Sequence, residues 1–240
     1  MTTAKERLIE QLERVRRLRE ERHHVPGLAA AMDRLARWQA RRLNGTYADL
    51  ARDPRYGKAI EFFGSDLYGP KDFSRHDADL ARVIPVMVRV LPEGAIATVA
   101  KAVELSALSL ELDRALVEAM GIGSALSMPV YCKAYRRCAN RPSREGQIAL
   151  VVEVGHELDR YVHKPLLRKI LSLMRRPARL AGLGALQNFL ERGFSSFASM
   201  RGADQFLAMI ADRETKLMEA IFDGDPGPFP DPLGSKEDSS

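Results

Sequence analysis

A glutamate and a histidine at helical spacing are the first candidates for chemistry. Glu153 and His156 are three residues apart, so a helix places both side chains on one face. An imidazole and a carboxylate are common ligands of zinc, iron or manganese. The next histidine, His163, lies two turns beyond His156, about 10 Å along the axis, which is too far for one metal. We therefore expect hydrogen-bonded structural side chains and keep a metal at Glu153 and His156 as the alternative.

Two further carboxylates share a face of a predicted long helix over 93–120. Glu104 and Glu111 are seven residues apart, with apolar residues on both sides of their stripe and a more polar face opposite. A buried carboxylate needs an arginine, a metal or a proton. We expect both to join an internal network with arginines of residues 133–179, while solvent exposure and a functional acid stay open.

The strongest concentration of positive charge covers residues 133–179, where 12 Lys and Arg stand against 4 Asp and Glu. Arginine binds phosphate through paired hydrogen bonds. The candidates for such contacts are Arg136, Arg137, Arg175 and Arg176. Nucleic acid is the weaker alternative, because no zinc finger or RNA-binding motif is present and few aromatic residues interleave for base stacking. Pairing with acidic segments of the chain explains the charge more simply.

Signatures of common enzyme classes do not occur in the sequence. The serine-hydrolase elbow, the phosphate-binding P-loop and the dinucleotide fingerprint are all missing. Cys132 and Cys138 fit no redox or zinc spacing, which favours a reducing compartment. The N-terminus is too charged for a signal peptide, and no apolar run reaches about 20 residues. We expect no cofactor and no transmembrane segment, and we favour a cytoplasmic protein that is not an enzyme.

The elements that must position these residues are helices. Ala, Leu and Arg are abundant, apolar residues recur with a 3.6-residue period, and 45% of the 240 residues are hydrophobic. We predict an all-α fold, a single multi-helix bundle of about eight or nine helices. The parts are a charged helical hairpin over 1–43, a bundle core over 44–222 and a disordered tail rich in Pro and Asp over 223–240.

The predicted hairpin suggests the leading functional hypothesis. Its first helix, over 3–23, has a narrow apolar stripe on an otherwise charged surface, and Pro26 ends it before a second, antiparallel helix. Such a stripe suits a helix that lies on a partner. We therefore expect a non-enzymatic interaction or adaptor protein, which binds another protein or a second copy through these helices. A small ligand or metal between helices, and a phosphate-rich partner of residues 133–179, are the alternatives.

The C-terminal half is predicted as a succession of helices separated by Pro and Gly. We expect one helix of about 30 residues over 143–174 and another over 178–192, begun by Pro177. A break near Gly193 or Gly202 precedes the last helix, over 204–222.

A short aromatic segment over 62–73 resembles the motif of the FFLEELY-motif proteins, a bacterial family. Phe62, Phe63 and the Leu67-Tyr68 pair match that motif, whereas Gly64-Ser65-Asp66 stands where the motif has Leu-Glu-Glu. The resemblance implies proteobacterial origin and brings no known activity. From the residues themselves we expect Phe62, Phe63 and Tyr68 to pack in the core, with partner docking or ligand lining as the alternative.

Overall fold

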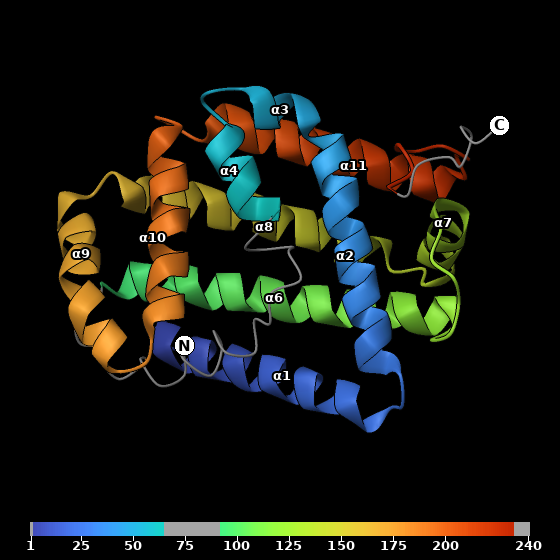
Figure 1. Cartoon of the computed structure of the whole chain (residues 1–240), viewed down its shortest axis with the longest axis horizontal. Coiled ribbons are helices and arrows are strands. Elements are labelled where there is room, and N and C mark those ends of the chain that lie inside the picture. The colour runs from blue at the N-terminus through green and yellow to red at the C-terminus, as the bar shows by residue number, and fades with distance from the viewer. Residues whose placement is uncertain (1, 65–91, 233–240) are drawn as a thin grey trace.

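The computed structural model describes residues 2–64 and 92–232. These residues form ten helices and contain no strand, which confirms the all-α prediction (Figure 1). No helix in these two ranges is long and apolar enough to cross a membrane. Residues 65–91, which include most of the aromatic segment over 62–73, and the end of the tail at 233–240 lie outside the described residues.

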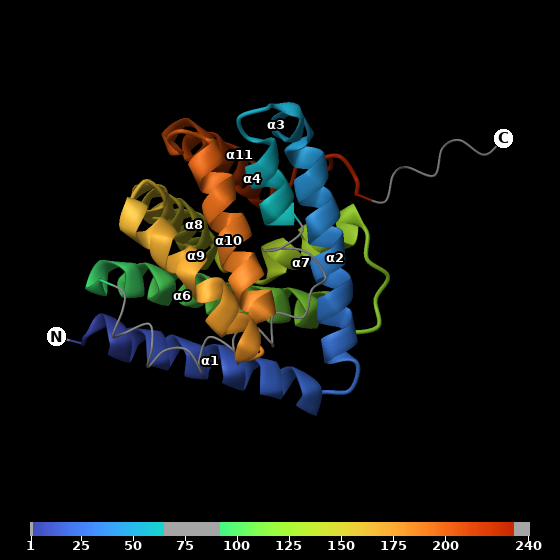
Figure 2. The ribbon, with the colours of Figure 1, turned by 60° about the vertical axis from the view of Figure 1, so that its left-hand side comes forward.

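The first helix, α1 (Ala4–His24), lies along α6 (Glu93–Met120) in both views of the fold (Figures 1 and 2). A capping box starts α1, since the Thr3 side chain accepts from the Glu6 amide and the Glu6 carboxylate accepts from the Thr3 amide. Its apolar stripe is buried against α6, with Leu8 and Val15 both 0% exposed. The stripe that suggested a partner surface is therefore covered by the same chain.

The second helix, α2 (Leu28–Thr46), crosses away from α1 at a steep angle (Figures 1 and 2). Gly27 turns the chain with a φ of 79°, a backbone conformation that glycine adopts most easily. The sequence predicts an antiparallel pair, but the two helices pack mainly on other elements, because the apolar faces of both meet α6. The hairpin is thus a connection in the chain and contributes little packing of its own.

A core with one tryptophan at its centre joins α2 to α7 (Met128–Arg137) and α11 (Asp204–Asp223). Trp38 is 0% exposed, and its ring lies 4.6 Å from that of Tyr131 and 5.7 Å from that of Phe229. Phe229 belongs to the segment expected to be disordered, yet it is buried. Its aromatic side chain supplies the apolar contact that holds residues 224–232 against the bundle.

A second core lies under the short helices α3 (Ala48–Arg52) and α4 (Gly57–Phe62). They pack with α10 (Gly184–Ser199) and α11 through aromatic side chains, with the Tyr56 and Phe206 rings stacked 5.6 Å apart. Gly193 was expected near a helix end, but it lies inside α10. An added Cβ there would press on the Phe62 ring, so close packing explains this glycine.

The predicted 30-residue helix over 143–174 is two helices, α8 (Arg141–Val162) and α9 (Pro165–Leu180). The correction has a local cause, because Lys164 precedes Pro165 and takes an extended conformation that a helix cannot continue through. Pro177 lies inside α9 instead of starting the next helix. Gly182, with a φ of 76°, separates α9 from α10.

Candidate functional site

A polar cavity of about 110 Å³ lies between α2, α6, α7, α8 and α11, beside the end of α4. That space is enough for several water molecules or one small ligand. Its polar lining residues are Gln39, Arg42, Asn44, Tyr47, Ser109, Asp113, Tyr131, Tyr135, Arg144, Gln147 and Glu214. Burying so many polar groups costs free energy unless each has a hydrogen-bond partner. The groups that lack a partner therefore indicate what the cavity could bind.

The wall formed by α2 and α11 contains an ion pair between Arg42 and Glu214. Arg42 Nη1 donates to Glu214 Oε1 over 2.6 Å, and the Tyr47 hydroxyl donates to the same oxygen over 2.7 Å. Burial alone would lower the pKa of Arg42, but the charge and hydrogen bond of Glu214 raise it above its ordinary value. This wall therefore carries a compensated ion pair.

The opposite wall, formed by α7 and α8, carries Arg144, which forms no ion pair with any of the described residues. Arg144 is 5% exposed, its Nη1 donates to Gln147 Oε1 over 3.3 Å, and its Cζ lies 4.5 Å from the centre of the Tyr135 ring. Its Nε and Nη2 atoms are shielded from solvent and make no hydrogen bond. These two atoms form one edge of the guanidinium group, the edge that binds both oxygens of an oxyanion.

Burial shifts the pKa of the other titratable groups of the cavity in the direction of the neutral form. Burial raises the pKa of Asp113, while a hydrogen bond from Gln39 Nε2 over 3.0 Å and the charge of Arg144 act in the opposite direction. Burial also raises the pKa of Tyr131 and of Tyr135. Their hydroxyls stay protonated at neutral pH, so the cavity offers hydrogen-bond donors around a positive charge.

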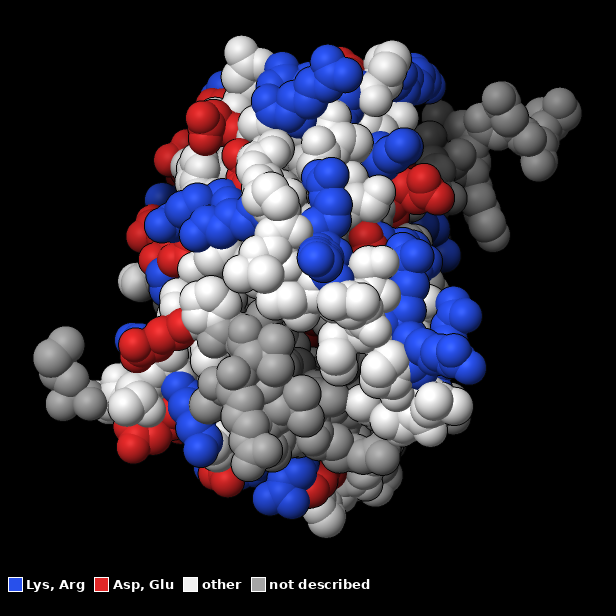
Figure 3. Space-filling model, turned by 90° about the vertical axis from the view of Figure 1, so that its left-hand side faces the viewer, with Lys and Arg blue, Asp and Glu red and all other residues white. Residues whose placement is uncertain are grey.

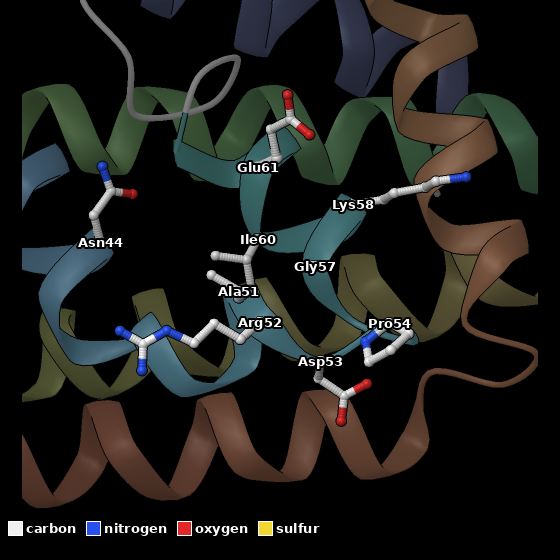
Figure 4. Close-up of a pocket in the computed structure, with 9 residues that line it drawn as sticks. All are labelled: Asn44, Ala51, Arg52, Asp53, Pro54, Gly57, Lys58, Ile60 and Glu61. Carbon is white, nitrogen blue, oxygen red and sulfur yellow. The ribbon is translucent and has the colours of Figure 1, made fainter.

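A larger hollow of about 460 Å³ lies at the surface between α3 and α4 (Figure 4). Its charged side chains Arg52, Asp53, Lys58 and Glu61 point in different directions and away from the hollow's centre. Because no two of them converge on one point, we take the smaller, buried cavity as the candidate site.

Of the two carboxylates predicted to form a network, Glu111 pairs with an arginine from another part of the chain. Glu111 accepts from Arg14 Nε over 2.9 Å and from Nη2 over 2.6 Å, so its arginine comes from α1 and not from residues 133–179. The packing of α1 along α6 explains this choice. The charge of Glu104 also acts on Arg14. The polar face of the same helix, which carries Asp113, is the one that lines the cavity.

Glu153 and His156 have separate partners on different helices. Glu153 pairs with Lys101 over 2.5 Å, and His156 Nδ1 lies 3.2 Å from Asp204 Oδ1. Within the two described ranges, no three side chains of the metal-ligating types come together. Cys132 is buried, and burial raises the pKa of its thiol to about 11, so it is no ready nucleophile.

The four arginines chosen from the basic block do not share a face. Arg136 Nη1 donates to the Ile221 carbonyl over 3.0 Å and Arg137 Nη1 to the Ala119 carbonyl over 3.2 Å, so both satisfy carbonyls near helix ends. Arg175 pairs with Glu191, and Arg176 is exposed. The first two belong to α7 and the others to α9, at opposite ends of the molecule (Figure 1).

The aromatic segment divides between core and cavity. Phe62 is 6% exposed and its ring lies 5.3 Å from that of Phe189. Phe63 lines the cavity and packs on the rings of Phe197 and Phe206. Tyr68 lies outside the described residues.

The sequence analysis missed Arg144 as a site residue, although the pattern contains its signal. Arg144 stands four residues before Ile148 and seven before Val151, on the stripe that α8 turns inward. A charged residue at an inward position needs a partner. The total charge of residues 133–179 does not distinguish this inward position from the exposed ones.

No curated protein and no solved structure matches the chain. One family model matches it over residues 18–228, a span that contains the whole cavity. The family is described only as a domain of unknown function. By this match over most of its length, the chain belongs to the DUF8198 family.

Proposed function

We propose that this domain binds a small oxyanion, a carboxylate or a phosphate, in the cavity between α2, α6, α7, α8 and α11. The observation that carries the proposal is the unpaired edge of Arg144, a buried guanidinium that forms no ion pair with the described residues. Leaving a buried charge unpaired costs several kcal/mol, by order of magnitude. A ligand that supplies the missing negative charge removes that cost.

The same chain contains an example of the occupied edge. Arg14 uses Nε and Nη2 to hold the two oxygens of Glu111, with distances of 2.9 and 2.6 Å. Arg144 offers the same two atoms, and nothing in the described protein fills them. An oxyanion bound there would also come close to the donors of Tyr131 and Tyr135, which line the same space.

Neighbouring charges support an anion more than a cation. Arg42 is paired with Glu214, and burial shifts the pKa of Asp113 upwards, the direction that opposes a second negative charge beside an oxyanion. An anion beside Asp113 would favour its protonated form further, and that form can donate a hydrogen bond to the ligand.

The earlier hypothesis of an adaptor that docks through its N-terminal helices has less support. That hypothesis rests on the narrow apolar stripe of the otherwise charged α1, and the stripe is buried against α6. Docking through these helices stays a prediction that would have to use their charged faces.

Thermal unfolding in the presence of oxyanions tests the proposal. We expect sodium phosphate or sodium acetate, compared with sodium chloride at equal ionic strength, to raise the Tm of the wild-type protein with saturation. A ligand at 100 times its Kd adds about 2.7 kcal/mol of stability. The two salts separate a phosphate site from a carboxylate site.

Two matched variants assign the effect to the cavity. Arg144→Met removes the unpaired edge and should abolish the rise, whereas Arg14→Met removes the occupied edge on α1 and should leave it unchanged. An equal rise in Arg144→Met, or no rise with either salt in the wild type, would contradict the proposal.

A further inference from the structure

Helix α9 exposes a row of large apolar side chains. Leu166, Leu173 and Leu180 are 63%, 66% and 84% exposed, and each is seven residues from the next. Seven residues make almost two helical turns, so the three side chains form one row about 21 Å long. The half-buried Ile170 and the exposed Pro177 fill the gaps in this outer row. The opposite apolar face of α9 is buried inside the fold.

The inward side of α9 already has its partner. Leu167 and Ala178 are buried, and α9 packs against α10 and the end of α8. The outer row is therefore additional to what the fold needs. Monomeric proteins seldom leave a contiguous apolar surface uncovered without a use for it.

The charges of α9 are all of one sign. Between Pro165 and Leu180 the helix contains five Lys and Arg and no Asp or Glu. By helical rotation Lys169 and Arg176 border the outer row. Neither has a carboxylate partner among the described residues, whereas Arg175 is held by Glu191.

Figure 3 looks onto the side of the molecule where α9 lies in Figure 1, and Lys and Arg side chains alternate there with uncharged surface. Helix α9 is at the left edge of the bundle in Figure 1 and lies in the foreground, in front of α8, in Figure 2.

We propose that α9 docks on the surface of an anionic lipid bilayer. The outer row would enter the boundary between headgroups and acyl chains, and the basic side chains would contact lipid phosphates and carboxylates. The helix would lie in the plane of the membrane. This inference is independent of the cavity and of its ligand.

Charge argues against a second copy of the chain on the same face. A symmetric dimer through the outer row would bring Lys169 and Arg176, which border it, close to the same two residues of the second copy. An anionic bilayer supplies the opposite charge together with an apolar layer at the right depth. The observed combination fits that partner best.

Vesicle sedimentation with the full chain tests the proposal. Vesicles that contain a third phosphatidylserine should bind the protein, vesicles of pure phosphatidylcholine should not, and added salt should weaken the binding. Leu173→Ser/Leu180→Ser and Lys169→Glu/Arg176→Glu should each lower the partition coefficient about tenfold or more. All four side chains face solvent, so circular dichroism and Tm should stay at wild-type values.

Matched changes elsewhere provide the controls. Arg16→Glu/Lys216→Glu makes the same charge change at side chains that are 74% and 72% exposed, and Ile9→Ser removes an apolar group that is 36% exposed. Both should bind vesicles like the wild type. Equal binding to neutral vesicles, equal losses in the controls, or a dimer that Leu173→Ser/Leu180→Ser dissociates without vesicle binding would overturn the proposal.

Discussion

The two walls of the cavity treat a buried arginine in opposite ways. On the α2–α11 wall, Arg42 is 11% exposed at its side chain and has a carboxylate 2.6 Å away. On the α7–α8 wall, Arg144 is buried to a similar extent and has two nitrogen atoms without a partner. The ion pair of Arg42 is accounted for by its contribution to the stability of the fold. The unpaired edge of Arg144 is unfavourable for the empty protein, which is why we assign it to a ligand.

The largest difference between the walls should appear when the paired arginine is removed. Arg42→Met leaves Glu214 as an uncompensated buried charge and should lower the free energy of unfolding by about 3–5 kcal/mol. Urea denaturation followed by circular dichroism measures this loss. Arg42→Met/Glu214→Gln should regain part of it. The partner of Arg14, Glu111, is 38% exposed. If Arg42→Met lowers the free energy of unfolding no more than Arg14→Met does, the buried ion pair of the α2–α11 wall does not have the stabilising role that we assign to it.

The same substitution on the other wall should have the opposite sign. Arg144→Met removes two unsatisfied donors from the interior and keeps the length of the side chain. The lost hydrogen bond to Gln147 and the contact with Tyr135 offset part of the gain. We expect the ligand-free protein to become more stable by about 1 kcal/mol in the same denaturation experiment. A loss as large as that of Arg42→Met would show that the guanidinium has a structural role.

The comparison can be sharpened through two glycines of α8, the helix that carries Arg144. A Cβ added at Gly155 would collide with the Leu207 side chain of α11, so Gly155→Ala should destabilise by about 1–3 kcal/mol and weaken the response to oxyanions. Gly146 has nothing within 4 Å, so Gly146→Ala should stabilise by about 0.5–1 kcal/mol. If both variants change the Tm in the same direction, the close contact of Gly155 with Leu207 does not determine the position of α8.

The smallest effect concerns Asp113 and depends on pH. Because burial raises its pKa above the ordinary value of 3.8, the folded protein holds a proton that the unfolded chain releases. Stability falls as pH rises through the window between those two pKa values, and the penalty is complete above the folded one. Asp113→Asn should therefore be more stable than the wild type at pH 7.

The same variant has an internal control at low pH. Below pH 3.8 the carboxyl is protonated in both states, so the difference from the wild type should disappear there. Denaturation curves at pH 7 and pH 3 measure both values. A less stable Asp113→Asn at pH 7 would mean that its charged form pairs with Arg144.

Local patterns predicted the class of the fold, because helical periodicity needs only neighbours in sequence. They could not predict contacts between distant segments, such as the pair formed by Arg14 and Glu111, which are 97 residues apart. The helix break before Pro165 has a local cause, since the proline itself is visible in the sequence. The role of Arg144 needed both kinds of information, since its inward position is local but its missing partner depends on four other helices.

The chain has one tryptophan, and its place gives the molecule a built-in optical reporter. Trp38 is shut off from water and sits against Tyr131, which also lines the cavity. Emission excited at the indole band should shift to the red when the bundle opens. A ligand that moves the Tyr131 ring should change the intensity of the Trp38 emission, so ligand binding can be followed without any label.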